Sequence, residues 1–282
     1  MPELPETETI ARDLHAAIGG ARVEHAALIR PDVVRGIAPL DLSAWLCGRT
    51  IDRVWRRAKS VVLSLSGECH LVVTPRFTGA LILRNAANAS TADPASPPDD
   101  PYACVRMTLR DGRELRYTDV RRLGTVAAHD ADALRTWSAG LGPEPLDPEF
   151  TAERFSGCIR GSQRAIKAVL MDQTRVAGVG NIYANEALWR SRIRPSRRAS
   201  SLTRAERASL HAELTTVLRE AVAARGTSFR DYRDAFGERG AFAAQLKAYG
   251  RGGQPCVRCG RPLRASHAID GRATVWCAGC QK

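Results

Sequence analysis

Residues 170–184 have the sequence Leu-Met-Asp-Gln-Thr-Arg-Val-Ala-Gly-Val-Gly-Asn-Ile-Tyr-Ala, in which a glycine-rich turn separates two predicted helices, 163–172 and 181–191. Glycines let a backbone approach a phosphate closely, and the N–H groups that open the following helix attract anions. A plain turn between two helices can also contain Gly-x-Gly. The more specific signal is therefore Asn181 and the Ile-Tyr-Ala that follows it.

The chain on either side of this turn changes character near residue 130. Before that point, short β-rich runs between 21 and about 128 are separated by turn signals such as Ser66-Gly67 and Asp111-Gly112. An amphipathic helix is predicted over 5–18, and residues 85–100 have the composition of a flexible surface loop. Helices are also predicted over 150–159, 203–225 and 240–248.

Four of the eight cysteines are clustered at the C-terminus, where Cys256-Val-Arg-Cys259 and Cys277-Ala-Gly-Cys280 are separated by seventeen residues. Two such pairs joined by a β-hairpin predict a tetrahedral site with four thiolate ligands for one structural Zn2+, with no position left for water. Two disulfides or free thiols are the alternative. The other cysteines are scattered along the chain: Cys47, Cys69, Cys104 and Cys158.

Positive charge is concentrated in the second half of the chain. The net charge is +12; residues 141–282 contain 24 Lys and Arg against 13 Asp and Glu, whereas residues 1–140 contain 18 against 17. This asymmetry suggests a polyanion such as nucleic acid, although a solvated arginine-rich surface would give the same count. No signal peptide or membrane-length apolar run is present, so we expect a cytoplasmic protein, nucleoid-associated if bacterial, with no membrane partner.

Three motifs occur in one order along the chain: the N-terminal Met-Pro-Glu-Leu-Pro-Glu-Thr-Glu-Thr, the segment 170–184 quoted above, and the cysteine pairs with Arg272-Ala-Thr-Val-Trp between them. Together they resemble the formamidopyrimidine-DNA glycosylase family, the sister of endonuclease VIII, over almost the whole chain. The resemblance implies an α+β fold. Its predicted parts are an N-terminal catalytic β-sandwich with its helix (1–136), a linker (137–150), a helix-two-turn-helix domain (151–242) and a four-cysteine zinc finger (243–282).

In this family the N-terminal proline is the nucleophile, which implies that Met1 is removed and that Pro2 carries a free secondary amine. Attack of an amine on C1′ expels the base, and the iminium cation that results acidifies the C2′ proton and promotes strand elimination. Glu3 lies beside this amine and is the predicted proton shuttle. Glu6, one helical turn later, is predicted to support the site or the base. Taken alone, Pro2-Glu3 would be an ordinary chain terminus.

Other roles are implied residue by residue. Lys59 matches a lysine that contacts the sugar and phosphate at the lesion and assists elimination. Arg272 matches an arginine that binds the flanking phosphates and takes part in the second elimination. Asn181 and Lys167 match residues that face DNA. Lysines and arginines at such positions are otherwise often part of a solvated surface.

A base within the duplex must be extruded before it can react, and apolar wedge side chains commonly fill the vacancy. Arg121 matches the family arginine of this region. Phe77 stands where the family has methionine and Leu123 where it has phenylalanine, so a wedge is expected with its aromatic ring on the opposite loop. Alternatively, both are core residues at strand ends. Tyr102 and Ser162-Gln163 replace basic residues of the family, and we assign them no role.

The expected function is that of a monomeric, bifunctional DNA glycosylase and abasic-site lyase of base excision repair. Its expected partner is double-stranded DNA containing an oxidised base or an abasic site, bound in a cleft between the domains. Leu4 and the segment 226–241, which resembles a loop that covers an extruded 8-oxoguanine, favour oxidised purines. The alternatives are an endonuclease VIII-like enzyme for oxidised pyrimidines, a non-catalytic protein that binds damaged DNA, and a zinc-ribbon module for RNA or transcription.

Overall fold

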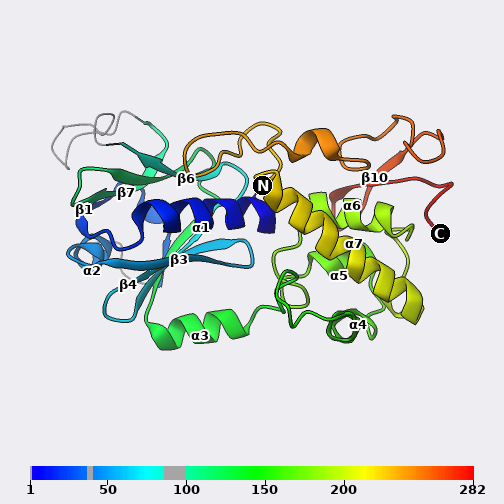
Figure 1. The fold of residues 1–282 in the computed structure, drawn as a ribbon, viewed down its shortest axis with the longest axis horizontal. Coiled ribbons are helices and arrows are strands. Elements are labelled where there is room, and N and C mark those ends of the chain that lie inside the picture. The colour runs from blue at the N-terminus through cyan, green and yellow to red at the C-terminus, as the bar shows by residue number, and fades with distance from the viewer. Residues whose placement is uncertain (1, 37–40, 86–99) are drawn as a thin grey trace. The chain divides into compact units, whose positions relative to one another are not determined.

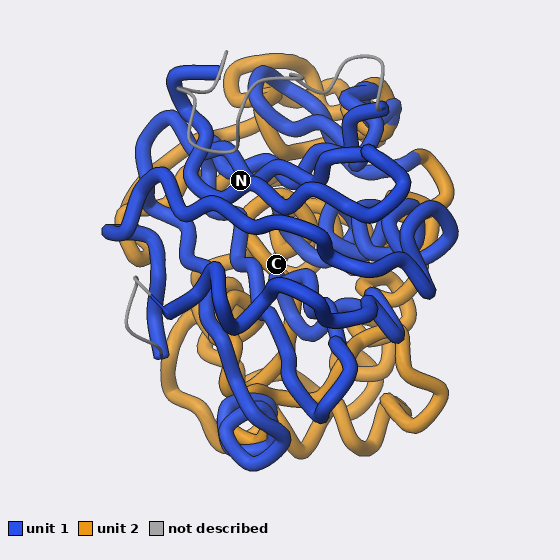
Figure 2. The backbone as a smooth tube through the Cα atoms, turned by 90° about the vertical axis from the view of Figure 1, so that its left-hand side faces the viewer, with its two compact units in different colours: residues 1–138, 225–241 blue, residues 139–224, 242–282 orange. Residues whose placement is uncertain are grey.

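The computed structural model describes residues 2–36, 41–85 and 100–282. The chain forms two compact units: unit 1 contains residues 1–138 and 225–241, and unit 2 contains residues 139–224 and 242–282 (Figure 1; Figure 2). Most of the loop predicted at 85–100 lies outside the described residues.

Unit 1 is built on two β-sheets, as the α+β prediction requires. One sheet has the strand order β1-β7-β8-β6, and the other has the order β2-β9-β5-β4-β3. All pairings are antiparallel except the short parallel pair of β2 with β9. The strands are β1 (Val23–Leu28), β2 (Val34–Arg35), β3 (Ile51–Arg57), β4 (Ser60–Leu65), β5 (Cys69–Thr74), β6 (Gly79–Arg84), β7 (Ala103–Leu109), β8 (Glu114–Asp119) and β9 (Thr125–His129).

Helix α1 (Leu4–Ile18) covers part of this core. Its buried side includes Ile10, Leu14 and Ile18, which are fully buried and belong to the same hydrophobic cluster as side chains of both sheets. This spacing of three and four residues is the apolar stripe of a helix packed on one side. Pro5 stands in the first turn, where its missing N–H costs no helical hydrogen bond.

Residues 225–241 pack within unit 1, although we predicted them as part of the domain 151–242. Leu83 donates its backbone N–H to Ala235 O at 2.8 Å, and Arg225 forms an ion pair with Asp13 of α1. Asp234, which is fully buried, also pairs with Arg225. Each of these contacts joins segments that are far apart in the sequence through a single polar group. The hydrophobic periodicity of a sequence does not reveal such contacts.

Unit 2 contains the predicted helices and the C-terminal hairpin. Glu186, fully buried in α6, accepts the backbone N–H groups of Lys247, Ala248 and Tyr249 at 2.8–3.0 Å and so attaches the C-terminal segment to the helices. The elements are α4 (Ala152–Ile159), α5 (Ile166–Met171), α6 (Asn181–Arg190), α7 (Arg204–Ala223), β10 (Arg264–Ile269) and β11 (Arg272–Trp276).

Short elements were predicted less well than long ones. Helix α2 (Leu42–Leu46) lies inside the region predicted as strands, and α3 (Ala131–Ala139) runs into the predicted linker. The helix predicted over 240–248 is reduced to a 3-10 turn, Phe242–Gln245. In such short segments the hydrophobic periodicity does not distinguish a helix from a strand or a turn.

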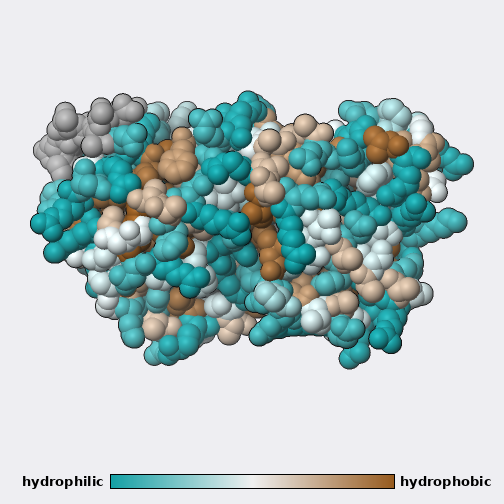
Figure 3. All heavy atoms as spheres, viewed as in Figure 1, coloured by the Kyte–Doolittle hydropathy of each residue, from teal (hydrophilic) through white to brown (hydrophobic). Residues whose placement is uncertain are grey.

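Within the described residues, no helix is long and apolar enough to cross a membrane. Hydrophilic side chains cover most of the surface seen in Figure 3, in keeping with the charged composition.

Helix α7 begins with a capping box in which Thr203 and Glu206 bind each other's backbone N–H groups. Hydrogen bonding to Arg197 is the main cause that lowers the pKa of Glu206 from 4.5 to about 2. Because the pKa of this carboxylate is lower in the folded protein than in the unfolded chain, the carboxylate stabilises the fold at any pH above its unfolded pKa. This stabilisation is lost as the pH falls toward 2. We expect Glu206→Gln to cost about 1 kcal/mol at pH 7 and progressively less below pH 4.5, as measured by urea unfolding.

The matched control is Glu213→Gln, because Glu213 lies on the same helix and forms no ion pair within the described part of the chain. A Glu206→Gln effect that stayed constant from pH 7 to pH 3 would contradict this account.

Candidate active site and nucleic-acid interface

The N-terminus of unit 1 is fixed by one buried carboxylate. Glu6, 1% exposed, accepts the backbone N–H of Glu3 at 2.8 Å through Oε2 and the N–H of Thr227 at 2.7 Å through Oε1. Pro2 and Glu3 are also buried. The geometry gives Glu6 a positioning role, since both of its oxygens are engaged by the backbone; contact with a base would compete with these bonds.

Lys59 lies in the two-residue turn of the hairpin formed by β3 and β4. Its neighbour Ala58 has φ +53°, a left-handed conformation that is costly for a residue with a Cβ. Arg56 supports this turn, because it binds Ala58 O at 3.1 Å and Glu8 of α1 at 2.8 Å. The start of α1 and the tip of this hairpin lie at the same end of unit 1 (Figure 1).

The two turns predicted to form the wedge are joined through Asp119, which is 1% exposed. Its Oδ1 accepts the Thr78 hydroxyl at 2.6 Å and the backbone N–H of Arg121 at 3.2 Å. Its Oδ2 accepts the backbone N–H of Gly124 at 2.8 Å. One buried carboxylate thus holds the turn after β5 and the turn after β8 together.

The residues predicted to form the wedge are exposed or partly exposed. The Arg121 guanidinium carbon lies 5.2 Å from the centre of the half-buried Phe77 ring, a cation–π contact across the two turns. Leu123 is 42% exposed and Val120 53% exposed. Leu123 is therefore not a core residue at a strand end, which was the alternative interpretation.

In unit 2, Gln173 supports the glycine-rich turn. Its amide nitrogen donates to Val179 O at 2.9 Å, and its amide oxygen accepts the backbone N–H of Gly178 at 2.9 Å. Gly178 has φ +78°, where a side chain would be strained. Asn181 follows as the first residue of α6 and is partly exposed, at the positive end of the helix dipole.

Arg272 is exposed directly after the Asp270-Gly271 turn that joins β10 to β11. The backbone that follows it is held from two helices. Lys167 Nζ of α5 donates to Ala273 O and to Thr274 Oγ1, both at 2.8 Å. Asn185 of α6 accepts the backbone N–H of Val275 at 2.8 Å and donates to Asn181 O at 2.6 Å.

The prediction that Lys167 faces DNA does not fit its position, because the side chain is fully buried. A buried ammonium needs hydrogen-bond acceptors, and the hairpin backbone provides them. Lys167 therefore anchors the hairpin that carries Arg272 and does not itself reach the surface.

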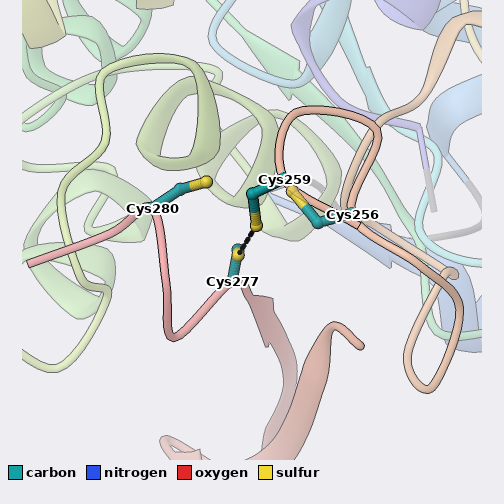
Figure 4. Close-up of side chains that lie close together, drawn as sticks. All are labelled: Cys256, Cys259, Cys277 and Cys280. Carbon is teal, nitrogen blue, oxygen red and sulfur yellow. Dashed lines mark hydrogen bonds between the residues drawn. The ribbon is translucent and has the colours of Figure 1, made fainter. Parts of the chain in front are cut away.

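The four clustered cysteines converge as their spacing predicts (Figure 4), with all four sulfur atoms within 4.8 Å of one another. The Sγ atoms of Cys259 and Cys277 are 3.4 Å apart, far beyond the roughly 2.05 Å of a disulfide. Four thiolates around one tetrahedral ion about 2.3 Å away would lie about 3.8 Å apart. The arrangement therefore fits a metal ion.

Packing fixes this cluster on α6. Cys256 and Cys277 share a hydrophobic cluster with Trp189, whose ring also lies 4.2 Å from the guanidinium carbon of Arg258. Burial opposes ionisation of Cys256, but hydrogen bonds such as the one from the backbone N–H of Arg258 outweigh it and lower its pKa to about 6. Burial and the neighbouring sulfur atoms, by contrast, raise the pKa of Cys277 and of Cys280, so it is the geometry of the four sulfur atoms that supports a metal site here.

Sequence reasoning missed the groups that support these residues: Asp119, Gln173, Asn185 and Glu186. Asn185 had a detectable signal, since it is a polar residue one helical turn after Asn181 in a predicted helix whose residues 182–189 are mostly apolar. Asp119 and Gln173 had none, because their partners are backbone groups of turns.

Comparisons with known proteins agree with this geometry. The family model described as the formamidopyrimidine-DNA glycosylase N-terminal domain matches residues 1–126, and the one described as the formamidopyrimidine-DNA glycosylase H2TH domain matches residues 141–233. Formamidopyrimidine-DNA glycosylases of Heliobacterium modesticaldum and Roseiflexus sp. are 42% and 39% identical to this chain, with both chains covered completely.

Solved structures show the same fold. Wild-type Lactococcus lactis Fpg (MutM), in complex with DNA containing N7-benzyl-Fapy-dG, matches with TM-score 0.89 and 30% identity over the whole of both chains. The MutM (Fpg) protein of Thermus thermophilus matches with TM-score 0.86 and 36% identity, over 99% of this chain and 98% of that one.

The fold and these matches define an enzyme of the DNA glycosylase class that acts in base excision repair. The chain belongs to the formamidopyrimidine-DNA glycosylase family.

The Lys167 anchor is testable without any substrate. We expect Lys167→Met to lower the free energy of unfolding by about 1–3 kcal/mol, because two hydrogen bonds from a charged donor are lost. Amide hydrogen exchange over β11 should become faster. Lys247→Met is the control, since the Lys247 side chain is partly exposed; equal exchange in the two variants would contradict the assignment.

Proposed function

We propose that this enzyme is a bifunctional DNA glycosylase and abasic-site lyase that removes oxidised purines, such as formamidopyrimidines and 8-oxoguanine, from double-stranded DNA. The observation that carries the proposal is the fixed N-terminus, where Glu6 holds the backbone of Glu3 next to Pro2. Lys59 at the same end of unit 1 supplies a cation.

The chemistry follows from a secondary amine at Pro2. Its lone pair attacks C1′ while the C1′–N bond to the base breaks, and Glu3 supplies or accepts protons during ring opening. The iminium that forms acidifies the C2′ proton, so that the 3′ phosphate and then the 5′ phosphate are eliminated. An α-amine is less basic than a lysine amine, which leaves more of it neutral near pH 7.

Unit 2 contributes phosphate binding in this proposal. Asn181 at the start of α6 and Arg272 at the tip of the β10–β11 hairpin are the two accessible contacts, whereas Lys167 and Asn185 act by holding them. Cys256, Cys259, Cys277 and Cys280 would hold one Zn2+, which supplies no chemistry beyond stabilising the hairpin.

Oxidised pyrimidines are the second candidate substrate class. A solved complex of wild-type Lactococcus lactis Fpg, 30% identical to this chain, contains DNA with an oxidised pyrimidine. Cleavage rates on matched duplexes containing 8-oxoguanine or thymine glycol separate the two possibilities, and faster cleavage of thymine glycol would reassign the substrate.

Borohydride trapping tests the nucleophile. We expect the enzyme to form a covalent adduct with a duplex containing 8-oxoguanine, because borohydride reduces the iminium to a stable amine. Pro2→Gly and a form with an uncleaved N-terminal extension are the controls, and the extended form should give no adduct. Tight binding with no adduct on either 8-oxoguanine or abasic DNA would favour the non-catalytic damage-binding alternative.

Metal analysis tests the cysteine site. We expect about one zinc per chain in the purified protein, and Cys259→Ser should lose most of it and lower DNA affinity. Cys47→Ser, which changes an exposed cysteine outside the cluster, should retain the zinc. A metal-free protein whose hairpin amides are nevertheless protected from exchange would contradict the structural role.

A further inference from the structure

Two arginines share the carboxylate of Glu8 on α1. Arg12 Nε lies 2.6 Å from Glu8 Oε1, and Arg56 Nε, on β3, lies 2.8 Å from Glu8 Oε2. The two ion pairs differ in burial, because the Arg12 side chain is 66% exposed and the Arg56 side chain only 7%. Exposed ion pairs on a helix contribute little to stability, so the pair with Arg56 is the one that can fix structure.

The contacts of Glu8 keep it charged. Burial opposes its ionisation, but the positive charge of Arg56 and hydrogen bonds from Arg56 and Arg12 outweigh burial and hold the pKa of Glu8 below its ordinary value. Arg56 uses a second N–H to bind Ala58 O at 3.1 Å. Because the N–H groups of a guanidinium lie in one rigid plane, the bond to Glu8 sets the direction of the bond to Ala58.

The carbonyl that Arg56 binds belongs to the peptide bond between Ala58 and Lys59. Of the two residues in this turn, Ala58 alone has a positive φ, as in a type II′ turn, whose first position usually holds glycine. An alanine keeps this conformation only where its surroundings support it. Since the Ala58 C=O and the Lys59 N–H share one planar peptide unit, the bond from Arg56 also orients the backbone from which the Lys59 side chain extends.

We propose that Glu8 and Arg56 are positioning residues for Lys59: their ion pair holds the Ala58 carbonyl and so directs the Lys59 side chain relative to Pro2. Glu8 lies on α1, the helix that follows Pro2 and Glu3, so the same helix orients the lysine and adjoins the nucleophile. This inference rests on the proposed function, in which Lys59 assists the elimination that follows iminium formation. A misplacement of about 1 Å at a reacting centre can slow a step by about 100-fold.

The kinetic test separates elimination from attack. Glu8→Gln removes the charge and keeps the size of the side chain; Arg12→Ala is the matched control, because it removes the exposed partner of the same carboxylate. Single-turnover reactions on an abasic duplex give the rates of borohydride-trapped adduct formation and of strand cleavage. We expect Glu8→Gln to slow cleavage about tenfold and adduct formation less than about twofold, so that the iminium accumulates.

Arg12→Ala should leave both rates as in the wild type. Equal slowing of adduct formation and cleavage in Glu8→Gln would indicate general destabilisation and overturn the positioning role. Slowing of cleavage by Arg12→Ala to the same extent as by Glu8→Gln would do the same, because Arg12 is not the residue that binds Ala58 O.

Lysine NMR gives a measurement that needs no catalysis. The chain has only four lysines, so reductive 13C-methylation gives few signals, and Lys59→Arg assigns the one from Lys59. We expect this signal to shift in Glu8→Gln and to stay in place in Arg12→Ala. An unchanged signal in Glu8→Gln would overturn the proposal whatever the activity. A shifted signal in an enzyme that forms no adduct would contradict the proposed lyase function and leave the positioning of Lys59 supported.

Discussion

The proposed chemistry depends on the buried carboxylate of Glu6. A chain terminus is normally one of the least ordered parts of a protein, yet a nucleophile at the terminus must be held in place. Glu6 provides this order by accepting the N–H of Glu3 and the N–H of Thr227. The same side chain thus ties the N-terminus to residues 225–241, a segment more than two hundred positions away in the sequence.

A related design recurs at three of the other candidate contacts. An exposed residue stands on a short turn, and a buried polar side chain binds the backbone of that turn: Asp119 for Arg121, Gln173 for the turn before Asn181, and Lys167 for the strand after Arg272. Backbone hydrogen bonds fix the position and leave the side-chain N–H donors available, although Asn185 also donates to Asn181 Oδ1 at 3.3 Å. Specific geometry is therefore combined with free donors, which phosphate and base recognition requires.

The sequence predicts features that are repeated locally and misses those created by one distant polar contact. Helical periodicity predicted α1 and α7. The spacing of the four C-terminal cysteines predicted that their sulfur atoms converge on one site. Nothing local distinguished Lys167 as buried. A compositional clue existed, however: only four of the 42 basic residues are lysines, so a lysine in this chain is a selected exception. A compact ammonium suits the buried site of Lys167 better than a guanidinium.

The phenylalanine at position 77, where the family has methionine, is tolerated because hydrogen bonds to other residues fix the turn that carries it. Asp119 binds Thr78 and the backbone of the neighbouring turn, and none of these bonds uses the side chain of residue 77. Substitution at that position therefore changes what the wedge presents to its surroundings while the turns keep their geometry. The backbone of Glu3, next to the proposed nucleophile Pro2, is fixed separately by Glu6, so a change at residue 77 leaves the geometry of the N-terminus intact.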